Sequence, residues 1–153
     1  MFKRICMVLA LAWPTLAQAQ TGGGLASCED AGVGLTSLAV GEHEGVRTFY
    51  QGQVVLLALN TEEPAAAPAG IAVLMPDPPV GNEPPSTGCW AIIGYGRVDV
   101  DRARARYDPA SGLTLTIPTM VYDADHDRDV AAPPIRLRIN ATRGTIVDQN
   151  AGR

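Results

Sequence analysis

The sequence predicts an all-β fold, an antiparallel β-sandwich or small barrel of about seven to eight strands with one disulfide. Apolar residues either alternate with polar residues or form short continuous runs, and no segment keeps a 3.6-residue period over three turns. The 153 residues include 16 glycines and 12 prolines, which suit a chain with many turns. Hydrophobic residues make up 46% of the chain, which argues against wholesale disorder.

Strands in the first half are predicted where β-branched and aromatic residues gather between turn residues. A short strand is expected within 33–39, and a longer stretch covers 46–60, with Gly52 as a bulge or break. The continuous apolar run 54–59 predicts a central strand that is buried on both faces. The apolar run 70–75 is expected to pair back on it.

The next connection is rich in proline. The segment 76–88 contains five prolines, so it cannot be helical and is predicted to be an extended surface loop. Cys89 would anchor the far end of this loop.

The clearest local signal is a hairpin within 90–122, whose turn at 108–112 has proline and glycine where a tight reversal favours them. Pairing across the turn places Arg104 opposite Thr116 and Arg106 opposite Thr114. The alternation then assigns one shared core face, which carries Ala103, Ala105, Tyr107, Leu113, Leu115 and Ile117. The phase of the alternation shifts upstream, which predicts a bulge near 100–102.

The last strand repeats this alternation. Ile135, Leu137 and Ile139 are predicted to point toward the core, while Arg136 and Arg138 point outward. The segment 145–147 is expected to close the domain.

The first residues have the pattern of a bacterial secretory signal peptide. Lys3 and Arg4 precede an apolar stretch that ends in an A-x-A cleavage pattern. The stretch is too short to span a bilayer, and no later segment reaches about 18 apolar residues, so no transmembrane segment is expected in the mature chain. We therefore expect a periplasmic or secreted protein. The predicted organisation is a signal peptide at 1–19, a flexible Gly-rich tail at 20–27, a single β-domain at 28–149 and a C-terminal tail at 150–153.

The cysteines agree with export. Cys6 lies in the predicted leader, which leaves Cys28 and Cys89 as an even pair, and in an oxidising compartment such a pair predicts a disulfide. Lipidation of Cys28 is the alternative, because the segment 25–28 resembles a lipobox. That motif should directly follow the apolar stretch, whereas residues 21–24 intervene here, so lipidation is less favoured.

An acidic segment between Tyr122 and Ile135 raises the question of calcium. Its alternate residues are Asp123, Asp125, Asp127 and Asp129. This spacing matches the first ligand positions of an EF-hand loop, but Arg128 replaces the required glycine and Pro134 replaces the final glutamate. The EF-hand is therefore excluded. A looser calcium site and a solvated acidic loop both remain open.

Arginines on the predicted outer face of the sheet form the second candidate site. They are Arg102, Arg104, Arg106, Arg136 and Arg138. Such a face could bind an anionic glycan or a lipid headgroup through charge-assisted hydrogen bonds. The simpler interpretation is a solvated sheet face whose charges discourage pairing with other chains.

No pattern of catalytic residues stands out. The sequence has no Gly-x-Ser-x-Gly elbow, P-loop or dinucleotide fingerprint, and no lysine follows the predicted leader. His43 and His126 could hold zinc only if the fold brought them together. Apart from calcium as an open alternative, no cofactor is expected, and the protein is predicted not to be an enzyme.

The formal net charge of -4 argues against a nucleic-acid partner bound through its phosphates. The sequence thus indicates an exported, non-catalytic β-domain that binds a protein or surface component of the cell envelope. Two alternatives remain open. One is a calcium-dependent binding module that uses the 123–129 segment, and the other is a small secreted hydrolase that uses carboxylates or zinc.

Overall fold

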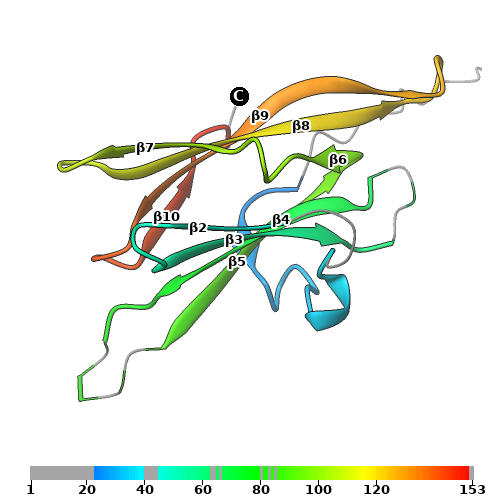
Figure 1. The fold of residues 1–153 in the computed structure, drawn as a ribbon. Coiled ribbons are helices and arrows are strands. Elements are labelled where there is room, and N and C mark those ends of the chain that lie inside the picture. Colours follow the sequence, from blue (N-terminus) through cyan, green and yellow to red (C-terminus); the bar gives the residue numbers. More distant parts are fainter. Residues whose placement is uncertain are drawn as a thin grey trace, which may run out of the picture.

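The computed structural model describes residues 23–39, 45–62, 65, 67–79, 81, 82, 84 and 86–151. These residues form two antiparallel sheets that face each other as the layers of a sandwich (Figure 1). A disulfide joins Cys28 to Cys89, as predicted. The all-β prediction is confirmed, and of its two forms the structure shows the sandwich and no closed barrel. The predicted signal peptide at 1–19 lies outside the described residues.

The first sheet has the strand order β1-β5-β4-β3-β2. Its strands are β1 (Ala26–Ser27), β2 (Val46–Phe49), β3 (Val54–Asn60), β4 (Ala69–Pro76) and β5 (Thr87–Tyr95). The predicted pairing of the two apolar runs is confirmed, because β3 pairs with β4 from Val55 opposite Leu74 to Asn60 opposite Ala69. The two-residue β1 lies in the segment for which the sequence predicts a tail, and Ala26 pairs there with Ala91 of β5.

The second sheet has the order β10-β9-β8, and both β6 and β7 pair with successive parts of β8. Its strands are β6 (Arg97–Val98), β7 (Arg104–Asp108), β8 (Gly112–Asp123), β9 (Arg128–Asn140) and β10 (Thr145–Asp148). The chain leaves the sheet between β6 and β7, where the sequence predicts a bulge. Arg104 lies opposite Thr116 and Arg106 opposite Thr114, as predicted.

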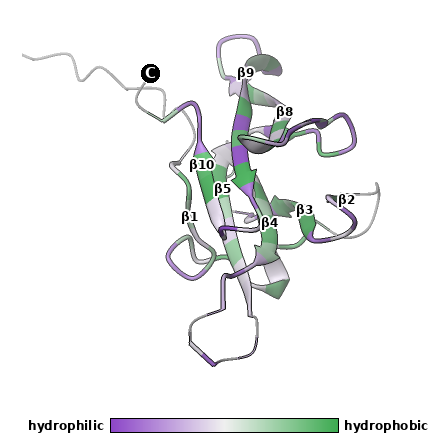
Figure 2. Ribbon diagram, turned by 90° about the vertical axis from the view of Figure 1, so that its left-hand side faces the viewer, coloured by the Kyte–Doolittle hydropathy of each residue, from purple (hydrophilic) through white to green (hydrophobic). Residues whose placement is uncertain are grey.

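The main core lies between the two sheets. Leu115 and Leu137 face each other across β8 and β9, and both are fully buried. Figure 2 shows the matching alternation of hydrophobic and hydrophilic residues along β9. The other large, fully buried residues of this core are Val54, Leu56, Ile71, Val73, Met75, Ile92, Ile117, Ile135 and Ile139.

A smaller apolar cluster covers the other face of the first sheet. Cys28, Leu59, Ala72 and Ala91 are its buried members, and residues between 31 and 38 pack against them. The prediction of a strand within 33–39 is wrong, because Leu35–Ser37 form a single 3-10 turn. Most of this segment crosses the sheet face, where its backbone groups find partners in local turns. Only its end meets a strand, through a single bridge between Leu38 and Leu59 of β3.

One part of the predicted core face is also wrong. Ala103 is buried, but Ala105 is exposed and Tyr107 is 55% exposed. The reason lies in the sheet order, because β7 is at the edge of its sheet and all five of its residues are exposed. The period-two pattern assigns the face correctly, but whether that face is covered depends on the opposite layer.

The turn between β7 and β8 allows a test of the strand pairing. Gly112 has a φ of 89°, and a Cβ atom there would collide with the carbonyl oxygen of Ile139 on β9. We expect Gly112→Ala to lower the midpoint of thermal unfolding, followed by circular dichroism, by several degrees more than Gly52→Ala. Gly52 is the matched control, since its φ is 84° and a Cβ there has no neighbour within 4 Å. An equal fall in the unfolding midpoint of both variants would show that β9 can move away from the added methyl group without loss of stability.

Candidate functional site

Two rows of polar side chains cross the outer face of the second sheet. One row consists of Arg104, Thr116 and Arg136, and the other consists of Arg106, Thr114 and Arg138. These residues face away from the core because the alternate residues Leu115 and Leu137 are fully buried. We call Arg104, Arg106, Arg136 and Arg138 the arginine quartet.

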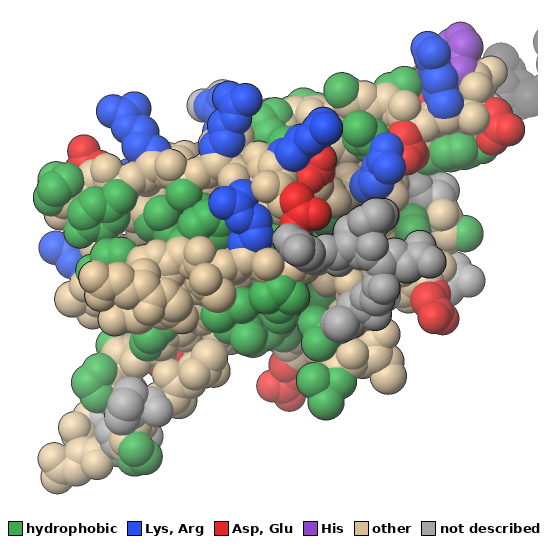
Figure 3. All heavy atoms as spheres, viewed as in Figure 1, with side chains coloured by type: hydrophobic (Ala, Val, Ile, Leu, Met, Phe, Trp, Pro, Cys, Tyr) green, Lys and Arg blue, Asp and Glu red, His purple; other side chains and the backbone are tan. Residues whose placement is uncertain are grey.

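The strand geometry spaces the quartet regularly. The arginines of one row are separated by β8, so their Cα atoms lie about 10 Å apart, and neighbours along one strand lie about 7 Å apart. All four side chains belong to exposed residues. Figure 3 shows Lys and Arg side chains that project in succession from this layer of the molecule.

The quartet has no carboxylate partner in the described part of the chain. The ion pairs there join Arg97 to Asp129 at 3.9 Å, Arg102 to Asp99 at 3.5 Å and His126 to Asp123 at 2.8 Å. In the amide orientation that satisfies both groups, the Gln149 side-chain oxygen accepts from Nη2 of Arg138 at 2.7 Å. The quartet therefore presents its charge to solvent.

Asp108 is the acidic residue next to the quartet along β7. Its carboxylate accepts hydrogen bonds from the backbone of the following turn. Its Oδ1 accepts hydrogen bonds from the backbone N–H groups of Ser111 at 2.9 Å and Ala110 at 2.8 Å. These bonds hold the pKa of the Asp108 carboxyl below its ordinary value, and Arg106 contributes less to this shift.

Arg102 lies apart from the other four predicted arginines. It belongs to the turn that precedes β7, where its backbone N–H donates to Oδ1 of Asp99 at 2.9 Å and its Nε forms the 3.5 Å ion pair with the same carboxylate. The sequence groups five arginines by their spacing, and the strand register brings four of them together.

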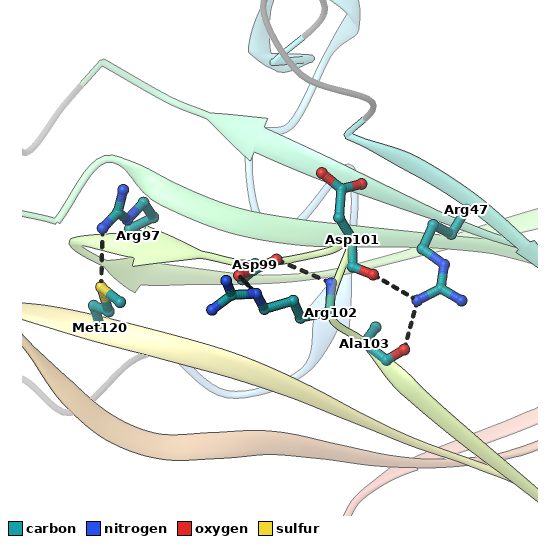
Figure 4. Close-up of polar contacts among 7 residues, drawn as sticks. All are labelled: Arg47, Arg97, Asp99, Asp101, Arg102, Ala103 and Met120. Atoms are coloured by element: carbon teal, nitrogen blue, oxygen red, sulfur yellow. Dashed lines mark hydrogen bonds and ion pairs between the residues drawn. The ribbon is translucent and has the colours of Figure 1, made fainter.

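Arg47 of β2 makes a contact between the two sheets that the sequence pattern does not predict. Figure 4 shows its side chain reaching the turn before β7, where Nη1 donates to the carbonyl oxygens of Asp101 at 2.9 Å and Ala103 at 2.5 Å. The guanidinium also lies 5.1 Å from the centre of the Phe49 ring. Arg47 thus ties the edge of one sheet to the other, and no local sequence signal indicates this.

Three of the four aspartates of the acidic segment contact different partners: Asp123 contacts His126, Asp127 contacts Tyr122, and Asp129 pairs with Arg97. Asp123 contacts Nδ1 of His126 and accepts from the backbone N–H of Asp125 at 3.0 Å. The Tyr122 hydroxyl donates to Asp127 at 2.7 Å, and this bond raises the pKa of the Tyr122 hydroxyl. The described residues include no group of three side chains placed to hold a metal ion. The calcium hypothesis stays a prediction, and the zinc hypothesis involves His43, which lies outside the described residues.

Two cavities lined by described residues lie at opposite ends of the sandwich. The larger, of about 820 Å³, is lined by residues such as Ala58, Arg97, Asp99, Arg102 and Pro118. Its arginines already have acidic partners, as described above. The smaller, of about 230 Å³, lies beside Tyr50 and Tyr107 and is lined at depth by Val54, Leu113 and Ile139.

The fold and this site define a sandwich-like β-domain with one disulfide and an arginine-bearing sheet face. Comparison with protein-family models, curated proteins and solved structures gives no match. Within the described residues, no helix has the length and apolar character needed to cross a membrane.

Proposed function

We propose that the protein is an exported, non-catalytic β-domain that binds an acidic partner protein of the cell envelope through the arginine quartet. The observation that carries the proposal is the quartet itself: four in-register arginines without a carboxylate partner among the described residues. The chain has 16 acidic and 12 basic residues, yet among the described residues no carboxylate forms an ion pair with the quartet. Asp108, the acidic neighbour on β7, accepts hydrogen bonds from the backbone of the following turn. Export is supported by the leader-like residues 1–19 and by the disulfide, which persists in oxidising compartments.

The chemistry of arginine favours carboxylate ligands at this face. Guanidinium is always charged and donates two parallel hydrogen bonds to one carboxylate. The sheet holds the Cα atoms in place, so the spacing of about 7 Å along a strand exists before the partner arrives. Carboxylates on alternate residues of an extended peptide have the same spacing. This match favours an extended acidic segment of a protein over a lipid headgroup.

The proposal is tested with poly-L-glutamate as the probe, in low salt, by isothermal titration calorimetry. Replacing the whole quartet with alanine is expected to weaken binding at least about tenfold, because each exposed contact with a carboxylate contributes about 0.6 kcal/mol. Binding to the unaltered protein should weaken as salt is added. The control is the double variant Arg128→Ala, Arg143→Ala, which removes two exposed arginines outside the quartet and should bind normally.

Two further probes separate the classes of ligand. Heparin represents a sulfated glycan, and vesicles of anionic phospholipid represent a membrane surface. Unchanged binding of poly-L-glutamate by the quartet variant would overturn the proposal. Quartet-dependent binding of heparin or vesicles, with none of poly-L-glutamate, would overturn the protein partner and assign the face to that other ligand.

A further inference from the structure

Among the strands of the described structure, β7 is the least protected, and one of its edges is free. β7 pairs with β8 on one side, and all five of its residues are exposed. An edge strand presents backbone N–H and C=O groups that can pair with an added strand. We propose that the partner adds an extended acidic strand to this edge, with carboxylates facing Arg104 and Arg106 and apolar side chains facing Ala105 and Tyr107. The inference rests on the proposed function, because both arginines belong to the quartet.

The outer side of β7 selects for acidic residues. Arg104 and Arg106 lie two residues apart on the same strand face, and residues directly opposite on an added strand have Cβ atoms about 5 Å away. Glutamates at alternate positions can therefore meet both guanidiniums. A second copy of β7 in the antiparallel direction would place Arg106 opposite Arg106 or Arg104, and this repulsion disfavours self-pairing. Asp108 would meet Arg104 only in the register centred on Arg106, and its carboxylate already accepts hydrogen bonds from Ala110 and Ser111.

The inner side of β7 selects for apolar residues. Ala105 and Tyr107 point toward the opposite layer but remain exposed. The Tyr107 ring lies 5.7 Å from the ring of Tyr50, which is itself 39% exposed. Figure 3 shows hydrophobic side chains directly below the row of cationic side chains on this side of the molecule. An added strand that alternates acidic and apolar residues would thus match both sides of β7.

Arg47 fixes where the added strand can begin. It occupies the carbonyl oxygens of Asp101 and Ala103, immediately before β7. The free edge therefore starts at Arg104 and ends at the turn after Asp108. A partner segment of about five to seven residues covers this length.

The test uses a synthetic peptide of alternating glutamate and valine, with blocked ends, in fluorescence anisotropy against the full mature chain. Two N-methylated versions are the decisive pair: one carries methyl groups on the amides of the glutamates, the other on those of the valines. In an added strand, one of these two sets of amides points at β7 and the other points away. We expect one methylated peptide to lose binding at least tenfold and the other to bind within about twofold of the parent.

Protein variants supply the second measurement. Arg104→Ala and Arg106→Ala should each weaken peptide binding about threefold or more. Arg128→Ala is the control, because it removes an exposed arginine of the same sheet that lies outside the quartet and does not belong to β7. It should change the affinity by less than about twofold. Amide hydrogens of β7 should exchange more slowly when the peptide is bound.

The outcomes separate this inference from the proposed function. Equal binding by both methylated peptides, combined with weaker binding by Arg104→Ala, would overturn strand addition and leave the arginine quartet as a side-chain site. Equal losses from Arg104→Ala and Arg128→Ala would also overturn it, because the peptide would then respond to the overall charge of the protein and not to the edge of β7. Failure of both the peptide and poly-L-glutamate to bind would overturn both proposals.

Discussion

Replacing Cys28 and Cys89 together with alanine is expected to lower the free energy of unfolding by about 4 kcal/mol. The two cysteines are separated by 61 positions, and their bond removes the corresponding loop-closure entropy from the unfolded chain. For a domain of this size, the loss corresponds to a fall of about 15 °C in the midpoint of thermal unfolding.

The packing around the disulfide predicts that its removal also loosens one particular segment of the chain. The bond holds the segment after Cys28 across the first sheet, where it covers Leu59, Ala72 and Ala91. Thermal unfolding by circular dichroism with and without reductant is the measurement, and reduced wild-type protein should approach the alanine variant. A variant as stable as the oxidised protein would mean that apolar packing alone holds this segment.

Leu115→Ala is expected to destabilise the domain by about 3 kcal/mol. Leu115 is fully buried between the layers and lies opposite Leu137, which is also fully buried. Truncation removes apolar contacts from both sheets and leaves a cavity that two hydrogen-bonded strands cannot readily close.

Chemical denaturation with urea measures this effect. Leu35→Ala is the control, because Leu35 is 87% exposed and its truncation should change the free energy of unfolding by less than about 0.5 kcal/mol. A loss below about 1 kcal/mol for Leu115→Ala would contradict a tightly packed centre of the sandwich.

The hairpin built from β7 and β8 shows which structural features can be predicted from the local sequence pattern. Its turn, its register and the outward direction of Arg104 and Arg106 follow from alternation and from the turn residues at 108–112. The same holds for β9, where Arg136 and Arg138 alternate with buried residues. These features depend on neighbours within one or two strands, so a single sequence contains the necessary information.

Other features depend on how the two layers overlap. Tyr107 follows the core pattern but remains 55% exposed, because β7 lies at the edge of its sheet. The segment that contains Leu35 was predicted as a strand and instead forms a 3-10 turn across a sheet face. Arg47 has no pattern of its own, yet it joins the two sheets beside β7. Local periodicity does not indicate which residues of distant strands will contact each other.

The amino-acid sequence by itself determined the class of this protein: an antiparallel β-domain with a Cys28–Cys89 disulfide and arginines on an outward sheet face. Period-two alternation and turn chemistry act over a few residues, and they suffice for these conclusions. Only the tertiary structure decided that four of the five arginines lie together, that they lack carboxylate partners among the described residues, and that β7 keeps a free edge. These properties arise from the order of strands in each sheet and from the offset between the two layers, which long-range packing sets.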